Sequence, residues 1–308
     1  MNVLITGGGG YVGTSLIPQL LAEGHEVTVY DNLMFGGNQL IPFFSNPKFK
    51  FVLGDVRDKS MLSESVKDKD LVIHLAAIVG YPACRKDPEL TKSVNIEGTK
   101  NLISSLSSSQ VVVFASTGSN YGSVEDICTE ETPLNPLSLY GQTKTIGEEI
   151  IFKHPKSIVY RFATAFGLSP RLRLDLLIND FTYKCVSQGY LVVYEKEFKR
   201  TFIHVSDMGR AFLLATQKHE AMYGNAYNVG DNNLNYTKKE ICDFISAKTS
   251  AYIHYADVGE DADKRNYEVS YEKINSLGFS IIKGVEDGIE ELIKSFKVIN
   301  TVSPYCNA

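Results

Sequence analysis

Short apolar runs alternate with amphipathic segments along the first half of the chain. Runs rich in valine and isoleucine are typical of buried β-strands. They lie at residues 2–6, 25–31, 48–55, 70–77, 110–117 and 157–164. Between them, residues 11–24, 89–107 and 139–153 have the apolar spacing of helices, and Gly24 is placed to end the first of these.

Strands that are apolar on both faces need a layer of helices on each side of their sheet. The first half therefore predicts an α/β fold with a doubly wound parallel sheet, the Rossmann arrangement. Beyond Gly167 the regular alternation breaks down. Helices are expected at 171–186, 238–247 and 286–296, strands at 190–195, 200–205 and 225–230, and a charged loop at 259–268.

We interpret residues 1–167 as the Rossmann region and residues 168–308 as a smaller, mixed region. Some segments of the second region, at about 200–230, are expected to return to the main sheet. No low-complexity linker separates the two parts, so the second region is expected to cover the ligand edge of the sheet.

Composition narrows the classes of function. The chain has 308 residues, 44% apolar and 22% charged, which is typical of a soluble globular protein. A net charge of −5 offers no basic surface for nucleic acid or an anionic membrane. The five cysteines are dispersed, without metal-ligand spacing, and the apolar runs are too short to span a bilayer. We expect a cytoplasmic protein with reduced thiols and no metal, nucleic-acid or membrane partner.

A glycine-rich segment, TGGGGYVG at residues 6–13, joins the first strand to the first helix. Its T-G-x-x-G-x-x-G spacing lets the backbone turn tightly and approach a pyrophosphate, which would lie at the positive N-terminus of the helix. The expected cofactor contacts in this loop are Gly7, Gly10, Tyr11, Val12 and Gly13.

An acidic residue, Asp31, ends the second strand and is followed by Asn32. A carboxylate at this point can accept hydrogen bonds from ribose hydroxyls and repels a 2′-phosphate, which favours NAD over NADP. The alternative is a glycine-rich turn beside a helix-capping aspartate. An adenine pocket is expected at Asp55, Val56, Leu75, Ala76 and Ala77.

The fifth strand ends in Ser116 and Thr117, and Tyr140 and Lys144 follow on one face of the predicted helix at 139–153. All four would meet at the carboxyl edge of the sheet, where open α/β sheets bind ligands. A phenol is a weak base at neutral pH, but a neighbouring ammonium favours the phenolate, and a threonine hydroxyl can hold the reacting oxygen. Thr117, Tyr140 and Lys144 thus predict proton transfer coupled to hydride transfer. The alternative is a solvent-facing Tyr and Lys.

With these motifs in place, the chain resembles the extended short-chain dehydrogenase/reductases, the nucleotide-sugar epimerases and dehydratases. The resemblance rests on TGGGGYVG, HLAA, VNIEGT, STGSNYG, YGQTK, RFATAFG and RTFIHVSD. It implies that Thr117, Tyr140 and Lys144 are catalytic and that Asn95 has a supporting role. It also implies nicotinamide contacts at Phe162 and Ala163 and diphosphate contacts at Arg200 and Arg265. Relatives of this kind commonly form homodimers through two helices, which correspond here to 89–107 and 139–153.

Departures from the family pattern narrow the range of reactions that the chain is expected to catalyse. Dehydratases carry an Asp-Glu pair after the catalytic Thr, where this chain has Gly118 and Ser119, so dehydration is not expected. UDP-galactose 4-epimerases usually carry Lys near the position of Val79, and the absence of this Lys weakens an epimerase assignment without excluding it. A common substrate-contacting Asn is Thr164 here, which alters one expected substrate contact.

A closer resemblance, in LSPRLRLDLLINDFTYK, VYEKEFKRTFIHV and VGEDADKRNYEVS, is to GDP-heptose 4-dehydrogenases of polysaccharide biosynthesis. It suggests Arg171 and Arg173 as further sugar or phosphate contacts, with a solvated helix start as the alternative. We therefore expect oxidation at C4 of a nucleoside-diphosphate sugar. A UDP-glucose or UDP-galactose 4-epimerase and a catalytically silent dinucleotide-binding sensor remain as alternatives.

Overall fold

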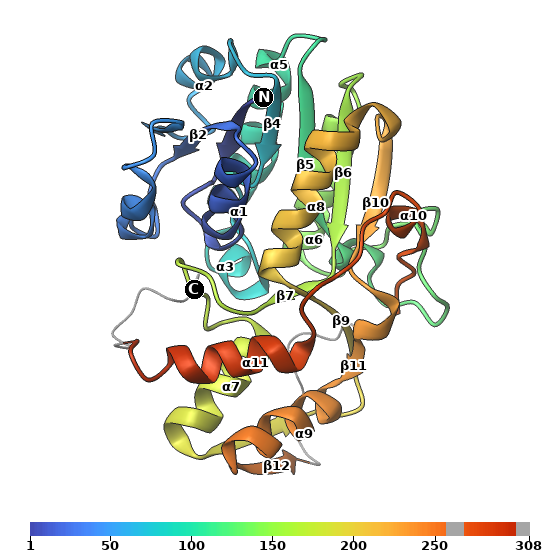
Figure 1. The fold of residues 1–308 in the computed structure, drawn as a ribbon. Helices are drawn as coiled ribbons and strands as arrows, with labels where there is room; N and C mark the ends of the chain where they lie inside the picture. The colour runs from blue at the N-terminus through green and yellow to red at the C-terminus, as the bar shows by residue number, and fades with distance from the viewer. Residues whose placement is uncertain (257–267, 300–308) are drawn as a thin grey trace.

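The computed structural model describes residues 1–256 and 268–299. Its centre is a parallel sheet of seven strands in the order β10-β6-β5-β4-β1-β2-β3 (Figure 1). These strands are β1 (Asn2–Thr6), β2 (Glu26–Asp31), β3 (Phe49–Leu53), β4 (Leu71–His74), β5 (Val111–Thr117), β6 (Ser157–Phe162) and β10 (Asn225–Val229). The predicted doubly wound α/β fold is therefore confirmed.

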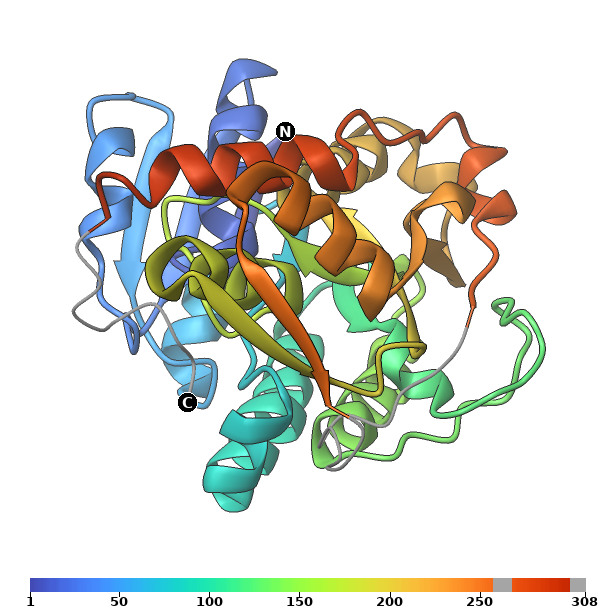
Figure 2. The same cartoon turned by 90° about the horizontal axis from the view of Figure 1, so that it is seen from below.

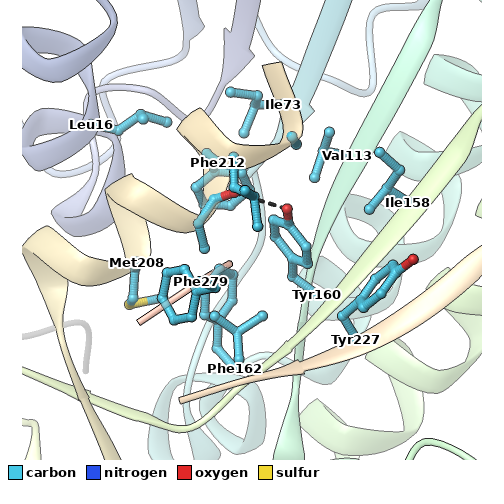
Figure 3. Packing of buried hydrophobic residues seen from close by; sticks show 14 of the residues in the cluster. Leu16, Ile73, Val113, Ile158, Tyr160, Phe162, Met208, Phe212, Tyr227 and Phe279 are labelled. Atoms are coloured by element: carbon cyan, nitrogen blue, oxygen red, sulfur yellow. Dashed lines mark hydrogen bonds between the residues drawn. The ribbon is translucent and has the colours of Figure 1, made fainter. Parts of the chain in front are cut away.

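Apolar clusters lie on both faces of this sheet, as its strand sequences require. In β1, Val3 and Ile5 belong to one cluster and Leu4 to the other, because successive side chains of a strand point to opposite faces. The first cluster packs under α1 (Tyr11–Ala22) and α8 (Val205–Lys218). Figure 3 shows its centre, where the Tyr160 hydroxyl donates to the Ala211 carbonyl at 2.8 Å.

The opposite face is covered by α2 (Lys59–Val66), α5 (Gly98–Ser105) and α6 (Leu139–Ile151). The helix expected at 89–107 is a continuous helical run: α4 (Pro88–Lys92), a π-helical turn η2 (Ser93–Glu97) and α5. Two helices on this side were not predicted, namely α2 and the short α3 (Tyr81–Lys86). The latter has six residues, two of them buried, too few for a clear period.

The second region forms its own apolar cluster around two small sheets. The three-stranded sheet contains β7 (Thr164–Phe166), β9 (Lys199–His204) and β11 (Asn235–Thr237), and the two-stranded one β8 (Tyr190–Tyr194) and β12 (Tyr252–Ala256). Three helices, α7 (Leu177–Gln188), α9 (Lys238–Thr249) and α11 (Val285–Ser295), pack together at this end of the molecule (Figures 1 and 2). The short α10 (Glu272–Asn275) packs beside β10.

The structure differs in detail from two of the expectations for the second region. The helix expected at 171–186 begins only at Leu177, because residues 171–176 run along the ligand edge and bury the side chains of Arg171 and Arg173. Of the segments near 200–230, β10 joins the main sheet, whereas β9 pairs with β7 and β11. Most of the expected charged loop at 259–268 lies outside the described residues. None of the helices in the described ranges is both long and apolar enough to cross a membrane.

Candidate active site

A cavity of about 490 Å³ opens at the carboxyl edge of the parallel strands. Its wall comes from the loops after β1 to β6, the first turns of α6 and the segment before α7. Such an edge is where open α/β sheets bind ligands. The predicted site residues in its wall are Gly7, Gly10, Tyr11, Val12, Gly13, Asp31, Asn32, Asp55, Val56, Leu75, Ala76, Ala77, Ser116, Thr117, Tyr140, Lys144, Phe162, Ala163, Thr164, Arg171 and Arg173.

The glycine loop packs so closely against neighbouring backbone that side chains at two of its positions would clash. Gly7 has φ +70°, and a Cβ there would lie 2.6 Å from the Ala76 backbone nitrogen. A Cβ on Gly13 would lie 2.4 Å from the Gly8 carbonyl oxygen, because α1 packs directly on the loop. The loop therefore brings bare backbone and the N-terminus of α1 to the cavity wall. These residues fit a dinucleotide pyrophosphate.

The carboxylate of Asp31 is held by backbone donors on two sides. Gly9 N–H donates to one oxygen at 2.9 Å and Leu33 N–H to the other at 2.7 Å. Burial raises the pKa of Asp31, and these two hydrogen bonds oppose the rise. Each oxygen keeps further lone pairs for a ligand hydroxyl. Asp31 thus connects the glycine loop to the expected ribose position.

Asp55, in the loop after β3, is held by hydrogen bonds from neighbouring side chains. Arg57 binds its carboxylate with two side-chain nitrogens, at 2.9 and 2.7 Å, and Asn32 donates at 3.0 Å. The hydrogen bond from Arg57 is the main reason that the pKa of Asp55 falls to about 2. Asp55 is therefore ionised at neutral pH and fixes the cavity wall at this point.

Lys144 is buried beside the end of β5. Its Nζ donates to the Ala115 carbonyl at 2.8 Å and lies 4.6 Å from the centre of the Phe114 ring. Burial lowers its pKa to about 8, so that the ammonium still predominates at pH 7. Tyr140 is half-buried in the first turn of α6, which Ser138 caps by accepting from Gly141 N–H at 3.1 Å.

Thr117 ends β5 and lies in the same wall. Its Oγ1 accepts from Ser119 N–H and donates to Ser119 Oγ, each at 3.1 Å. Ser119 also lines the cavity, a position that sequence reasoning considered only as the place of a missing acid. The neighbouring Ser116 hydroxyl turns the other way and donates to Glu148, so Ser116 contributes to the wall without a free hydroxyl.

Asn95, in the π-helical turn, connects three parts of the site. Its Nδ2 donates to Thr143 Oγ1 and to the Ile78 carbonyl, each at 3.0 Å, and its Oδ1 accepts from Ile78 N–H at 2.8 Å. Thr143 Oγ1 in turn donates to the Tyr140 carbonyl at 2.9 Å. The side chain of Asn95 therefore holds the loop after β4 against the first turn of α6.

The two arginines before α7 both lie in the cavity wall, so they are not part of a solvated helix start. Arg173 binds Asp175 with Nε and Nη2, at 3.1 and 2.6 Å. Arg171 lies over the ring of Phe35 at 4.5 Å, and its backbone N–H donates to Thr14 Oγ1 of α1 at 3.3 Å. Phe35 was not predicted, since a single aromatic residue in a polar loop has no periodic signal.

One predicted diphosphate contact, Arg200, does not line this cavity. Arg200 is 2% exposed on β9 and donates to the Lys199 carbonyl at 3.0 Å. Arg265 lies outside the described residues. Thr164 does line the cavity, and its buried Oγ1 has no hydrogen-bond partner within the described ranges.

Comparisons with known proteins agree with this geometry. The NAD dependent epimerase/dehydratase family profile matches residues 3–230. Low-salt glycan biosynthesis protein Agl12 of Haloferax volcanii is 28% identical over 95% of this chain and 97% of its own. A UDP-glucose 4-epimerase of Lacticaseibacillus casei is 29% identical over 75% of this chain and 76% of its own. The solved dTDP-glucose 4,6-dehydratase DesIV of Streptomyces venezuelae, with NAD bound, has a TM-score of 0.86 at 25% identity, covering 96% of this chain and 97% of that one.

The family match covers most of the chain, including every strand of the central sheet. The predicted family and the predicted cofactor, NAD, are thereby confirmed, whereas the closer resemblance to GDP-heptose 4-dehydrogenases stays a prediction. The chain is therefore an NAD-dependent enzyme and belongs to the NAD dependent epimerase/dehydratase family.

Proposed function

We propose that this enzyme oxidises the C4 hydroxyl of a nucleoside-diphosphate sugar and, in the complete cycle, reduces the ketone again as a 4-epimerase. The observation that carries the proposal is that Thr117, Tyr140 and Lys144 share one cavity with the glycine loop. Relatives named UDP-glucose 4-epimerase support the epimerase outcome. A GDP-heptose 4-dehydrogenase, which shares the oxidation step, is the second candidate, on the sequence resemblance before α7 and in β9.

In this mechanism Tyr140 takes the proton of the C4 hydroxyl and returns it on reduction. The Lys144 ammonium stabilises the phenolate through its charge, and Thr117 hydrogen-bonds the reacting oxygen and holds it in line. Bound NAD supplies the hydride acceptor. Gly118 and Ser119 contribute no carboxylic acid, so loss of water from the sugar is not expected.

For the diphosphates we propose Arg171 as an anion contact, since it lies in the cavity wall, where its backbone N–H binds Thr14 of α1 and its guanidinium lies over Phe35. Thr164 Oγ1 is proposed as a hydrogen-bonding group for the substrate, because a buried hydroxyl without a protein partner is costly unless a ligand or water satisfies it. A homodimer through the helical runs at 89–107 and 139–153 is a further proposal, supported by the exposed apolar side chains of Ile146 and Phe152.

Replacing Asp31 with asparagine is expected to weaken NAD binding by roughly tenfold to a hundredfold, the effect of losing hydrogen bonds to a charged group. An amide cannot accept from Gly9, Leu33 and a ribose as a carboxylate does, and it no longer repels a 2′-phosphate. Calorimetric titration with NAD and NADP checks both effects. Equal loss of affinity for the two dinucleotides would show that Asp31 only shapes the loop.

The activity is tested by mass spectrometry of nucleotide sugars recovered after incubation with the purified, NAD-loaded protein. The panel contains UDP-glucose, UDP-galactose, GDP-mannose and GDP-manno-heptose. An unchanged mass, with the C4 configuration found to be inverted in a follow-up NMR spectrum, is the expected result for the epimerase. Loss of two hydrogens would identify a dehydrogenase and its substrate, and loss of water would contradict the assignment of Gly118 and Ser119.

A further inference from the structure

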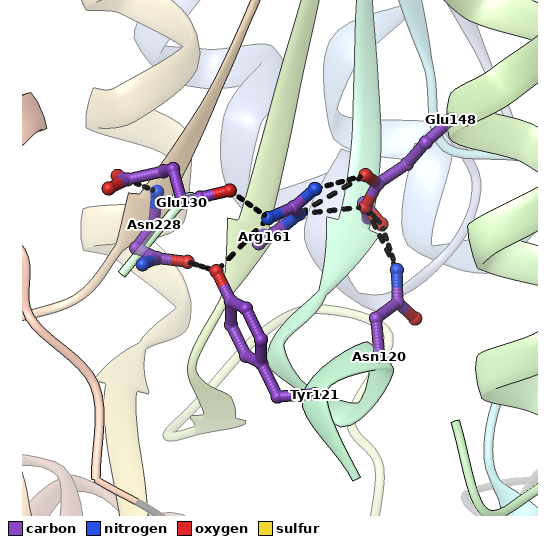
Figure 4. A network of polar contacts seen from close by, with 7 residues as sticks. Asn120, Tyr121, Glu130, Glu148, Arg161 and Asn228 are labelled. Atoms are coloured by element: carbon purple, nitrogen blue, oxygen red, sulfur yellow. Dashed lines mark hydrogen bonds and ion pairs between the residues drawn. The ribbon is translucent and has the colours of Figure 1, made fainter. Parts of the chain in front are cut away.

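A buried ion pair lies beneath the site, between α6 and the central sheet (Figure 4). The guanidinium of Arg161, on β6, approaches both carboxylate oxygens of Glu148, with Nη2 2.8 Å from Oε2 and Nε 3.2 Å from Oε1. Ser116 and Asn120 donate to the same carboxylate. Neither Glu148 nor Arg161 lines the cavity, so the pair acts on the site only through its neighbours.

The pair connects the catalytic helix to the end of β5. Tyr140, Lys144 and Glu148 are spaced one helical turn apart and so lie on one face of α6. Lys144 donates to the Ala115 carbonyl and Glu148 accepts from the Ser116 hydroxyl. These two consecutive strand residues directly precede Thr117. These two adjacent hydrogen bonds therefore fix the position of α6 along the strand that carries Thr117.

Arg161 is itself anchored on its far side, as Figure 4 shows. Its Nη1 donates to the Tyr121 hydroxyl at 3.1 Å and to the Glu130 carbonyl at 3.0 Å. The Tyr121 hydroxyl in turn donates to Asn228 Oδ1, on β10, at 2.7 Å. With these contacts the arginine cannot follow Glu148 if α6 shifts, so it serves as a fixed reference point for the helix.

Stability alone does not explain this arrangement. The side chains of Arg161 and Glu148 are 7% and 3% exposed, and ion pairs so deeply buried are often replaced by apolar residues without loss of stability. We propose that Glu148 is a positioning residue: paired with Arg161, it holds α6 so that Tyr140 and Lys144 stay opposite Thr117. This inference rests on the proposed function.

The charge of Glu148 also changes the pKa of a residue in the site. It raises the pKa of Lys144, partly opposing the effect of burial. Among the described residues, Cys84 on α3 and His74 on β4 also interact electrostatically with Lys144, and Tyr140 lies one turn before it on the same helix. Burial lowers the pKa of His74 to about 3, so at neutral pH it carries no charge that could replace that of Glu148.

The test compares Glu148→Gln, the double variant Glu148→Gln/Arg161→Met, and Glu149→Gln as a matched control on an exposed position of the same helix. For Glu148→Gln we expect kcat to fall about tenfold, with KM and NAD affinity within about twofold, since the cavity wall is intact. Its pH–rate profile should move to lower pH by roughly one unit, because loss of the Glu148 charge, which raises the pKa of Lys144, leaves the Arg161 charge unpaired and favours deprotonation of Lys144.

The double variant restores the charge balance, so its pH profile should return towards that of the unmodified enzyme while kcat stays low. NMR titration of the labelled lysine side chains, with Lys144→Met to assign the signal, follows the same shift without any sugar substrate. Failure to find a substrate would therefore not affect this part of the test. An unchanged kcat and pH profile, with only the melting temperature lowered, would overturn the proposal. If Glu148→Gln does not fold, the kcat of the double variant tests the proposal instead, and an unchanged kcat would overturn it.

Discussion

Tyr140→Phe is expected to lower turnover by roughly a thousandfold while NAD stays bound, the effect of removing a general acid–base group. The ring that packs in the wall of the cavity is retained, so the loss isolates the hydroxyl from the shape of the site. Turnover of the substrate identified by mass spectrometry measures the first effect, and calorimetric titration with NAD the second.

A matched control is Tyr252→Phe, which removes the same atom from a side chain that is 68% exposed on β12. It should behave as the unmodified enzyme. If Tyr140→Phe kept turnover within about tenfold, the proton would have to leave by another group, and the proposed mechanism would be wrong. If NAD binding were lost as well, the hydroxyl would matter chiefly for holding the cofactor.

Lys144→Met is expected to abolish most activity and at the same time to stabilise the fold. Burial holds the pKa of Lys144 at about 8, against 10.5 for a free lysine, so keeping the ammonium inside the protein at pH 7 costs about 3 kcal/mol. Methionine fills a similar volume without a charge. Turnover should fall at least a hundredfold, because nothing else on α6 supplies a positive charge beside Tyr140.

The pH dependence of stability follows from the same pKa. Between about pH 8 and 10.5 the unfolded chain holds a proton that the folded one has lost, so stability rises with pH through this window and the contribution is constant below it. In Lys144→Met that rise should disappear. Urea unfolding at several pH values, without added NAD, checks this, with Lys153→Met at an exposed position as control. A variant less stable than the parent at pH 7 would contradict the cost assigned to the buried charge.

The glycine loop and the acid at the end of β2 could be predicted because their signals are local. Bare backbone is needed at Gly7 and Gly13, where a Cβ would come within 2.6 and 2.4 Å of neighbouring backbone, and only one residue type satisfies that need. The apolar runs likewise predicted the strands of the central sheet, because parallel strands buried on both faces leave a continuous apolar pattern. The spacing of Tyr140 and Lys144, together with the family resemblance, also predicted their role in catalysis, which stays a prediction.

Local sequence patterns did not predict where the arginine side chains lie. Arg171, Arg173 and Arg200 are alike in the sequence, each in a mixed segment, yet in the structure the first two line the cavity and Arg200 does not. Their placement depends on where α7 begins and on which sheet β9 joins, and both follow from packing against distant elements. Glu148 was not predicted for the same reason: a single acid on an amphipathic helix is usually solvated, and only contact with Arg161 and Ser116 distinguishes it.

By itself the sequence determined the sheet, the dinucleotide loop and the residue types available at its edge, because these depend on periodicity and on backbone conformations set over a few residues. The tertiary structure alone decided which polar groups face the ligand and which face the core. Ser116 and Thr117 are neighbours on β5, but one hydroxyl binds Glu148 and the other lies in the cavity wall. Successive strand residues always diverge in this way, and the position of α6 decides which side is the site.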